Sequence, residues 1–144
     1  MRSIGVKLFL GLFLGSCSKE EMTIVTFPED YPSKWQLMSV VIGLSGSIVS
    51  GDQLPYFEEY IFNEDNTFSK TRTLEDTTIV VSGSFSIIDT YEKITLSLQY
   101  DEESPIIDNC IKDLREVLLV TSDQSFSNNV LACDRGSMGY SRVD

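Results

Sequence analysis

The sequence predicts an all-β domain of antiparallel strands, folded as a barrel or a sandwich. Short runs rich in β-branched and aromatic residues recur at a spacing of roughly 8–12 residues, with turn residues between them. One run, residues 93–100, alternates apolar and polar side chains, which indicates one buried and one solvated face. No run has a helical period, apart from a short candidate turn at residues 108–114.

Eight strands are expected. The clearest hairpin joins the second and third strands, because Asn66 can take the left-handed conformation that a short turn needs. Gly83, inside the fourth strand, predicts a bulge or a bend, whereas Gly46 and Gly51 mark a loop after the first strand. The expected strands are residues 34–44, 56–62, 67–73, 77–87, 93–100, 115–121, 129–133 and 139–143.

The N-terminus resembles an export signal. Arg2 and Lys7 precede an apolar run at residues 8–14 that is far shorter than the ~20 residues of a membrane-spanning helix. The tetrapeptide Leu14-Gly15-Ser16-Cys17 that follows resembles a bacterial lipobox. We therefore expect residues 1–16 to be a signal peptide and Cys17 to carry the lipid; the alternative is an ordinary secretory signal with a chance cysteine.

The residues after Cys17 predict a location. Ser18-Lys19-Glu20-Glu21 resembles the signal that sends lipoproteins of Bacteroidetes to the outer face of the outer membrane, so we expect a lipid-anchored, cell-surface protein; the alternative is the periplasmic face. Pro28 and Pro32 disfavour helix, which predicts a linker at residues 17–32 and a compact domain at residues 33–144. Acyl chains would then anchor the domain to the membrane without a spanning helix.

Composition excludes several functions. Two of the 11 basic residues lie in the signal, which leaves 9 against 22 acidic residues and a formal charge of −13 on the mature chain. Such a charge repels nucleic acid. The chain has no histidine, which removes the commonest general base and zinc ligand, so we expect neither an enzyme, nor a metal site, nor a cofactor.

Short motifs across residues 33–143 resemble the small lipocalin-like domains of Bacteroidetes lipoproteins. The resemblance implies an eight-stranded up-and-down antiparallel barrel with room for a small apolar cavity, and it implies no reaction. The motifs are Lys34-Trp35-Gln36-Leu37, the segment from Tyr60 to Phe68, Gly83-Ser84-Phe85, Ile94-Thr95-Leu96, Cys133-Asp134-Arg135-Gly136 and Tyr140-Ser141-Arg142-Val143.

Once Cys17 is lipidated, Cys110 and Cys133 remain as an even pair in an oxidising compartment. We expect a disulfide between them, which would stabilise the fold by roughly 3 kcal/mol on the chain-entropy model. The alternative is two buried thiols. Neither arrangement makes the cysteines catalytic, because the chain has no CxxC motif and no histidine.

Aromatic side chains are the candidate ligand site. They could line a small hydrophobic cavity, since an eight-stranded barrel has room for one small ligand; the alternative is a filled core. Trp35 could also close one end of the barrel beneath Arg142, or be an ordinary core residue. The candidate ligand-binding residues are Trp35, Tyr56, Tyr60, Phe62, Phe68 and Phe85.

Acidic clusters invite a calcium site or a carboxylate pair for glycoside hydrolysis, but no cluster has the spacing of a known calcium loop. We expect a solvated acidic surface. The clusters are Glu58-Glu59, Glu64-Asp65, Asp101-Glu102-Glu103 and Asp108.

The sequence thus predicts a membrane-tethered lipoprotein that binds a small hydrophobic ligand or an envelope component. The alternative is a structural or interaction protein with a filled barrel, whose loops at residues 45–53 or 101–108 meet a partner protein or a polysaccharide. The oligomeric state stays open.

Overall fold

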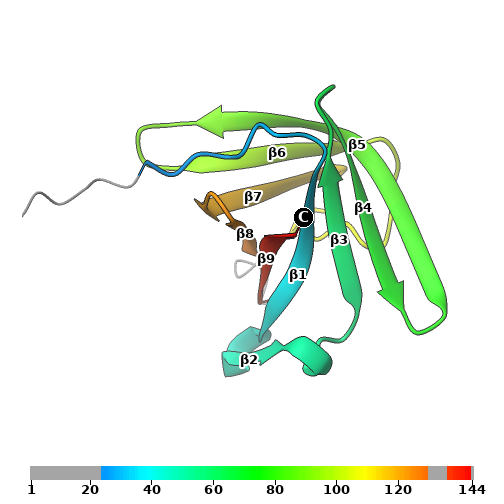
Figure 1. The fold of residues 1–144 in the computed structure, drawn as a ribbon. Helices are drawn as coiled ribbons and strands as arrows, with labels where there is room; N and C mark the ends of the chain where they lie inside the picture. The colour runs from blue at the N-terminus through cyan, green and yellow to red at the C-terminus, as the bar shows by residue number, and fades with distance from the viewer. Residues whose placement is uncertain (1–23, 130–135, 144) are drawn as a thin grey trace, which may run out of the picture.

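A computed structural model describes residues 24–129 and 136–143 (Figure 1). The described chain is all β, with two short 3-10 turns at Gly43–Ser45 and Gly51–Gln53. No helix of these residues has the length and apolarity to cross a bilayer. The strands are β1 Ser33–Ile42, β2 Ser47–Ser50, β3 Phe57–Phe62, β4 Thr67–Leu74, β5 Thr77–Asp89, β6 Ile94–Tyr100, β7 Arg115–Ser122, β8 Ser125–Asn129 and β9 Ser137–Val143.

Eight of these strands close into an antiparallel barrel. Each strand from β3 to β9 pairs with the next, and β1 completes the ring by pairing with β3 on one side and β9 on the other. The barrel, and not the sandwich, is therefore the fold. β2 lies outside the ring: it pairs with the last four residues of β1 and projects beyond the barrel end (Figure 1).

Alternation along each strand builds the core. In β6, Ile94, Leu96, Leu98 and Tyr100 are buried while the residues between them are partly or fully exposed, as the pattern at residues 93–100 predicts. The hairpin between β3 and β4 also matches its prediction, because Asn66 has φ +63° in the turn.

Gly83 was expected to make a bulge or a bend, and the bulge is absent. The ladders from β5 to β4 and β6 run through Gly83 without a shift in register, so the glycine makes no bulge. A Cβ at this position would collide with the Gln99 carbonyl and the Phe68 ring. The glycine is therefore needed because the chain and a ring approach closely there.

The N-terminal segment belongs to the folded unit, which therefore begins before Ser33. Phe27 is only 5% exposed; its ring stacks on Trp35 (centroids 5.3 Å apart) and meets Phe62 edge-on (5.5 Å). Tyr31 packs on Phe85. The prolines exclude helix as expected, but an extended segment can still bury a ring.

Three further expectations differ from the elements that the structure describes. Residues 47–50 form β2, although the two glycines indicated a loop throughout. The penultimate strand was expected at residues 129–133; the described strand is Ser125–Asn129, where Phe126 is the one buried apolar residue, and residues 130–133 lie outside the described residues. Residues 110–114 form bends, and residues 108–114 contain no helical turn.

Candidate functional site

The candidate aromatic residues lie together in the barrel. Five of them are buried in the core, and Tyr56 is partly buried against it. Their rings touch one another: the Phe62 centroid lies 4.9 Å from Phe85, 5.9 Å from Tyr60 and 6.1 Å from Phe68. This is the geometry of a packed core. A role in ligand binding stays a prediction for Trp35, Tyr56, Tyr60, Phe62, Phe68 and Phe85.

Trp35 lies at the end of the barrel that the N-terminal segment covers. Its Nε1 donates to Ser33 Oγ (3.0 Å), and its ring stacks on Phe27 with planes 15° apart. Arg142 is the cross-strand neighbour of Trp35, as expected for a partner, and its guanidinium pairs with Asp30 (2.6 Å). Phe27 thus stacks on one face of the Trp35 ring.

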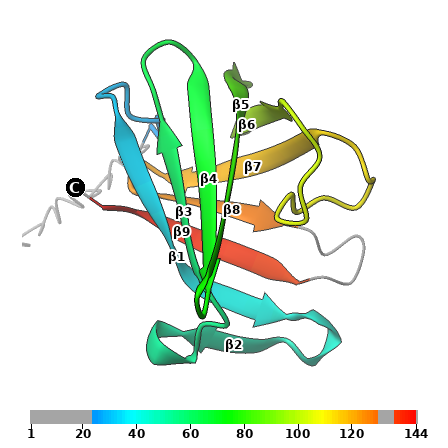
Figure 2. The same cartoon turned by 90° about the vertical axis from the view of Figure 1, so that its right-hand side faces the viewer.

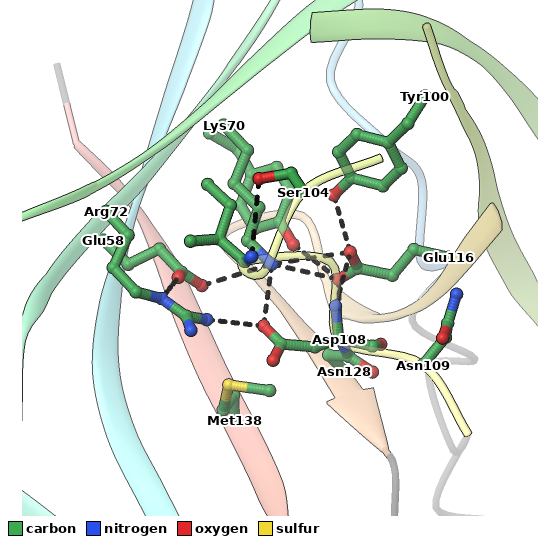
Figure 3. Close-up of polar contacts among 12 residues, drawn as sticks. Glu58, Lys70, Arg72, Tyr100, Ser104, Asp108, Asn109, Glu116, Asn128 and Met138 are labelled. Carbon is green, nitrogen blue, oxygen red and sulfur yellow. Dashed lines mark hydrogen bonds and ion pairs between the residues drawn. The ribbon is translucent and has the colours of Figure 1, made fainter. Parts of the chain in front are cut away.

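Charged side chains gather inside the barrel at the end where β6 stops and β7 starts (Figure 3). Lys70 of β4 is fully buried, and its Nζ lies 2.8 Å from Asp108, 3.4 Å from Glu116 and 3.5 Å from Glu58. Arg72 pairs with Glu58 and, at 2.6 Å, with Asp108. We call these five residues the buried ion cluster.

Glu116 is the most heavily bonded member of the buried ion cluster. Its Oε1 accepts from the Tyr60 hydroxyl and from Asn128 Nδ2, each at 2.6 Å, and its Oε2 accepts from the Tyr100 hydroxyl at 2.6 Å. Both oxygens therefore face donors, as an ionised carboxylate requires. Burial raises the pKa of Glu116, and the charge of Lys70 offsets part of that rise.

The cations stay protonated. Burial by itself lowers the pKa of Lys70, but the carboxylates of Glu116, Glu58 and Asp108 outweigh burial, so the net pKa is raised. The pKa of Arg72 is raised by the same balance. With all members charged, three carboxylates face two cations, which leaves one excess negative charge in the cluster.

Two of the candidate aromatic residues contact the buried ion cluster. Tyr60 donates to Glu116 and carries Lys70 over its ring at 5.0 Å. Tyr56 lies beneath Arg72, whose guanidinium carbon is 4.1 Å from the ring centroid. A cation over an aromatic face is stabilised by the ring quadrupole. Tyr140, which we had not singled out, donates to Glu58.

The loop between β6 and β7, residues 101–114, covers this end of the barrel (Figure 2). Ile106 is buried in the core, and the Asp108 N–H donates to Glu116 (3.4 Å) while its carbonyl accepts from Asn128 (3.1 Å). Two pockets open at the loop, with volumes of about 590 and 340 Å³. Asp108, Glu116 and Asn128 line the smaller one.

The expectation of a solvated acidic surface was wrong for Glu58 and for Asp108. Glu58 is fully buried, and Asp108 is held by two cations. Glu58 points inward because it is two residues before Tyr60, on the same face of β3. This alternation along β3 is the feature of the sequence that could have predicted a buried Glu58.

In the described residues no metal-binding group is found, and a cation lies between two carboxylates of the cluster. No group of three histidine, cysteine, aspartate or glutamate residues in the described chain is arranged to hold a metal ion. The Lys70 ammonium lies between Glu58 and Glu116, in the space that a glycosidic oxygen would need between two catalytic carboxylates. That the protein is not an enzyme stays a prediction.

The cysteine predictions fall largely outside the described residues. Cys17 and Cys133 both lie there, and Cys110 is in the covering loop. Lipidation of Cys17 and the Cys110–Cys133 disulfide therefore stay predictions.

No family model, no curated protein and no solved structure matches this chain. The site is thus interpreted from its own geometry.

Proposed function

We propose that this chain is the precursor of a lipid-anchored envelope protein, and that its lipocalin-like barrel is a binding module for a small molecule. The binding site is at the end of the barrel covered by residues 101–114. The observation that carries this proposal is the buried ion cluster beside the two pockets.

Burial of three charged side chains, with two more that are mostly buried, makes stability an insufficient explanation for the cluster. Each buried ion costs several kcal/mol of hydration, and buried ion pairs are often no more stabilising than apolar residues of similar size. Charged groups that are buried beside a pocket are instead typical of binding or catalytic sites. Since Lys70 fills the space between the carboxylates, binding is the better supported of these two.

This placement differs from the site expected from the sequence. The aromatic candidates pack on one another, and none of them lines either pocket. We therefore place the ligand beside the cluster and the loop, and regard the aromatic interior as the support beneath them.

Binding is tested by extraction of the domain at residues 18–144, which keeps every described residue, after purification from a native-like host without detergent. Mass spectrometry of the extract should find a small molecule in stoichiometric amount. The domain with Arg72→Gln, in which one cation beside the pockets is removed, should lose that molecule. An empty extract, with no small molecule bound in later screening, would contradict the proposal.

The anchor is tested separately. Cys17→Ala should abolish metabolic labelling with palmitate, because the thiol is the site of acylation, and undiminished labelling would refute it. Replacement of Lys19-Glu20-Glu21 by alanines should protect the protein from protease added to whole cells if these residues direct it to the surface.

A second function, an interaction protein that binds a partner protein through its loops, is favoured by the β1–β2 hairpin. Leu44 is 92% exposed at its tip, and Ile42 and Ile48 are also exposed. Exposed apolar residues grouped on one projecting hairpin are typical of contact surfaces. A stoichiometric small molecule in the extract supports the first function, whereas a co-purifying protein that is lost on Leu44→Ser supports the second.

A further inference from the structure

Two side chains of the covering loop fill the end of the barrel. Ile106 is 2% exposed and packs in the hydrophobic core. Two positions later, the Asp108 carboxylate contacts Lys70 and Arg72. An apolar group followed by a carboxylate is the chemistry of a small carboxylic acid with an apolar tail.

The charges of the strands balance without the loop. Glu58 and Glu116 supply two negative charges, and Lys70 and Arg72 supply two positive charges. Asp108 is the third carboxylate, and it alone comes from the loop. Its departure would leave the four strand residues electrically neutral, and another carboxylate could then replace it charge for charge.

The contacts of Asp108 have the geometry of an anion site. Lys70 Nζ (2.8 Å) and Arg72 Nη2 (2.6 Å) converge on the same oxygen, Oδ2. The side chains of Arg72 and Asp108 keep 16% and 14% of their surface exposed, whereas those of Lys70, Glu58 and Glu116 are fully buried. A molecule arriving from solvent would therefore reach the cluster at Arg72 and Asp108.

The space next to this position suits a small apolar tail. The pocket of about 340 Å³ is lined by Asp108 and Glu116 and also by Ile111 and Val117, which are both largely exposed. The covering loop has no helix or strand to break on opening, and such segments open at lower free-energy cost than paired strands.

We propose that residues 101–114 are a lid, and that Lys70 and Arg72 are the head-group site for a small carboxylate with an apolar tail. The ligand takes the place of the Asp108 carboxylate and of the Ile106 side chain. This inference rests on the proposed function and names the ligand class of that site. The net negative charge of the domain slows the approach of every anion, but the two converging cations decide which head group is held.

The test uses residues 18–144 and three probes of equal chain length: octanoate, octanol and octylamine. Titration calorimetry should show that Asp108→Asn binds octanoate at least tenfold more tightly than the wild type does, because the competing carboxylate has been removed. Octanol and octylamine should bind neither protein. The matched control is Glu102→Gln, which removes one negative charge from the same loop at an exposed residue and should bind octanoate as the wild type does.

Other outcomes separate the two proposals. Equal affinity for octanoate and octanol, or no gain on Asp108→Asn, overturns the carboxylate site but leaves a binding module in place. An empty native extract together with no binding of any probe overturns both.

A second measurement uses only the wild-type protein, so its result does not depend on whether a variant folds. In the wild type, saturating octanoate should accelerate hydrogen exchange of the amides of residues 106–108, because the ligand displaces the lid, and octanol should not. Unchanged exchange in octanoate contradicts the lid.

Discussion

Lys70 Nζ lies 2.8 Å from Asp108 Oδ2, which joins the interior face of β4 to a loop 38 positions later in the chain. Lys70 also contacts Glu58 and Glu116. One ammonium group thus holds β3, β4, β7 and the covering loop together at one end of the barrel.

Lys70→Met should therefore destabilise the fold by about 3–5 kcal/mol, the cost of breaking a buried ion pair by removal of one partner. The variant leaves three carboxylates facing Arg72 alone. Urea unfolding followed by circular dichroism measures the free energy of unfolding. The matched control is Lys34→Met, since Lys34 pairs with Glu59 at the surface at 3.9 Å and exposed pairs contribute about 0–1 kcal/mol. Equal losses in the two variants would show that the cluster does not stabilise the fold.

Phe27→Ala should cost about 3–5 kcal/mol, as for other buried aromatic residues, because its ring packs between Trp35 and Phe62. Ile24→Ala is the control: Ile24 is 80% exposed, and the change should stay within about 0.5 kcal/mol. A Phe27→Ala variant as stable as the control would return residues 24–32 to the role of a linker.

Gly83→Ala should cost about 1–3 kcal/mol, the range for an added methyl group in a packed core. The new methyl would push against the Gln99 carbonyl and the Phe68 ring. Ser84→Ala, on the neighbouring exposed position, is expected to change the free energy of unfolding by no more than about 0.5 kcal/mol. The thermal midpoints of the two variants compare them directly.

The strands that the sequence predicts well are those in which apolar and polar residues alternate. Strands such as β6 alternate over seven residues, so their faces follow from the sequence. β8 has one buried apolar residue, Phe126, and no visible period. Phe27 lies outside the strands and is followed by two prolines. The local sequence there has no period that would show contact with a core built from distant strands.

The buried ion cluster could be predicted in part. Lys70 is in phase with Phe68, and Glu116 is in phase with Leu118, so the alternation places both inside the barrel. Opposite charges at inward positions of two strands indicate a pair. Asp108 could not be found in this way, because a loop has no period and the contact spans 38 positions.

The predicted disulfide has a direct test. The mature domain, measured by mass spectrometry without reductant, should be lighter by two hydrogens than the reduced protein, and a peptide joining Cys110 to Cys133 should appear after digestion. Cys110→Ser should remove that peptide. Two free thiols per molecule in the unreduced wild type would contradict the bridge.

Stability should fall steeply above pH 10. The pKa of Lys70 is raised above its ordinary value of 10.5, so its charge contributes stability that is present in full below pH 10.5 and is lost as the pH rises through the folded value. Burial raises the pKa of Tyr60, Tyr100 and Tyr140 above 10.0. Above pH 10 the unfolded chain therefore releases protons that the folded chain keeps, which favours unfolding.

Absorbance of tyrosinate at alkaline pH measures this directly. In denaturant all six tyrosines should titrate together, whereas in the native protein the three buried ones should ionise only as circular dichroism reports loss of the strands. Lys70→Met should move unfolding to lower pH, because the variant starts with less stability. Ionisation of all six tyrosines with the strands intact would show that Tyr60, Tyr100 and Tyr140 are open to solvent, and that their hydroxyl groups do not hold Glu116 and Glu58.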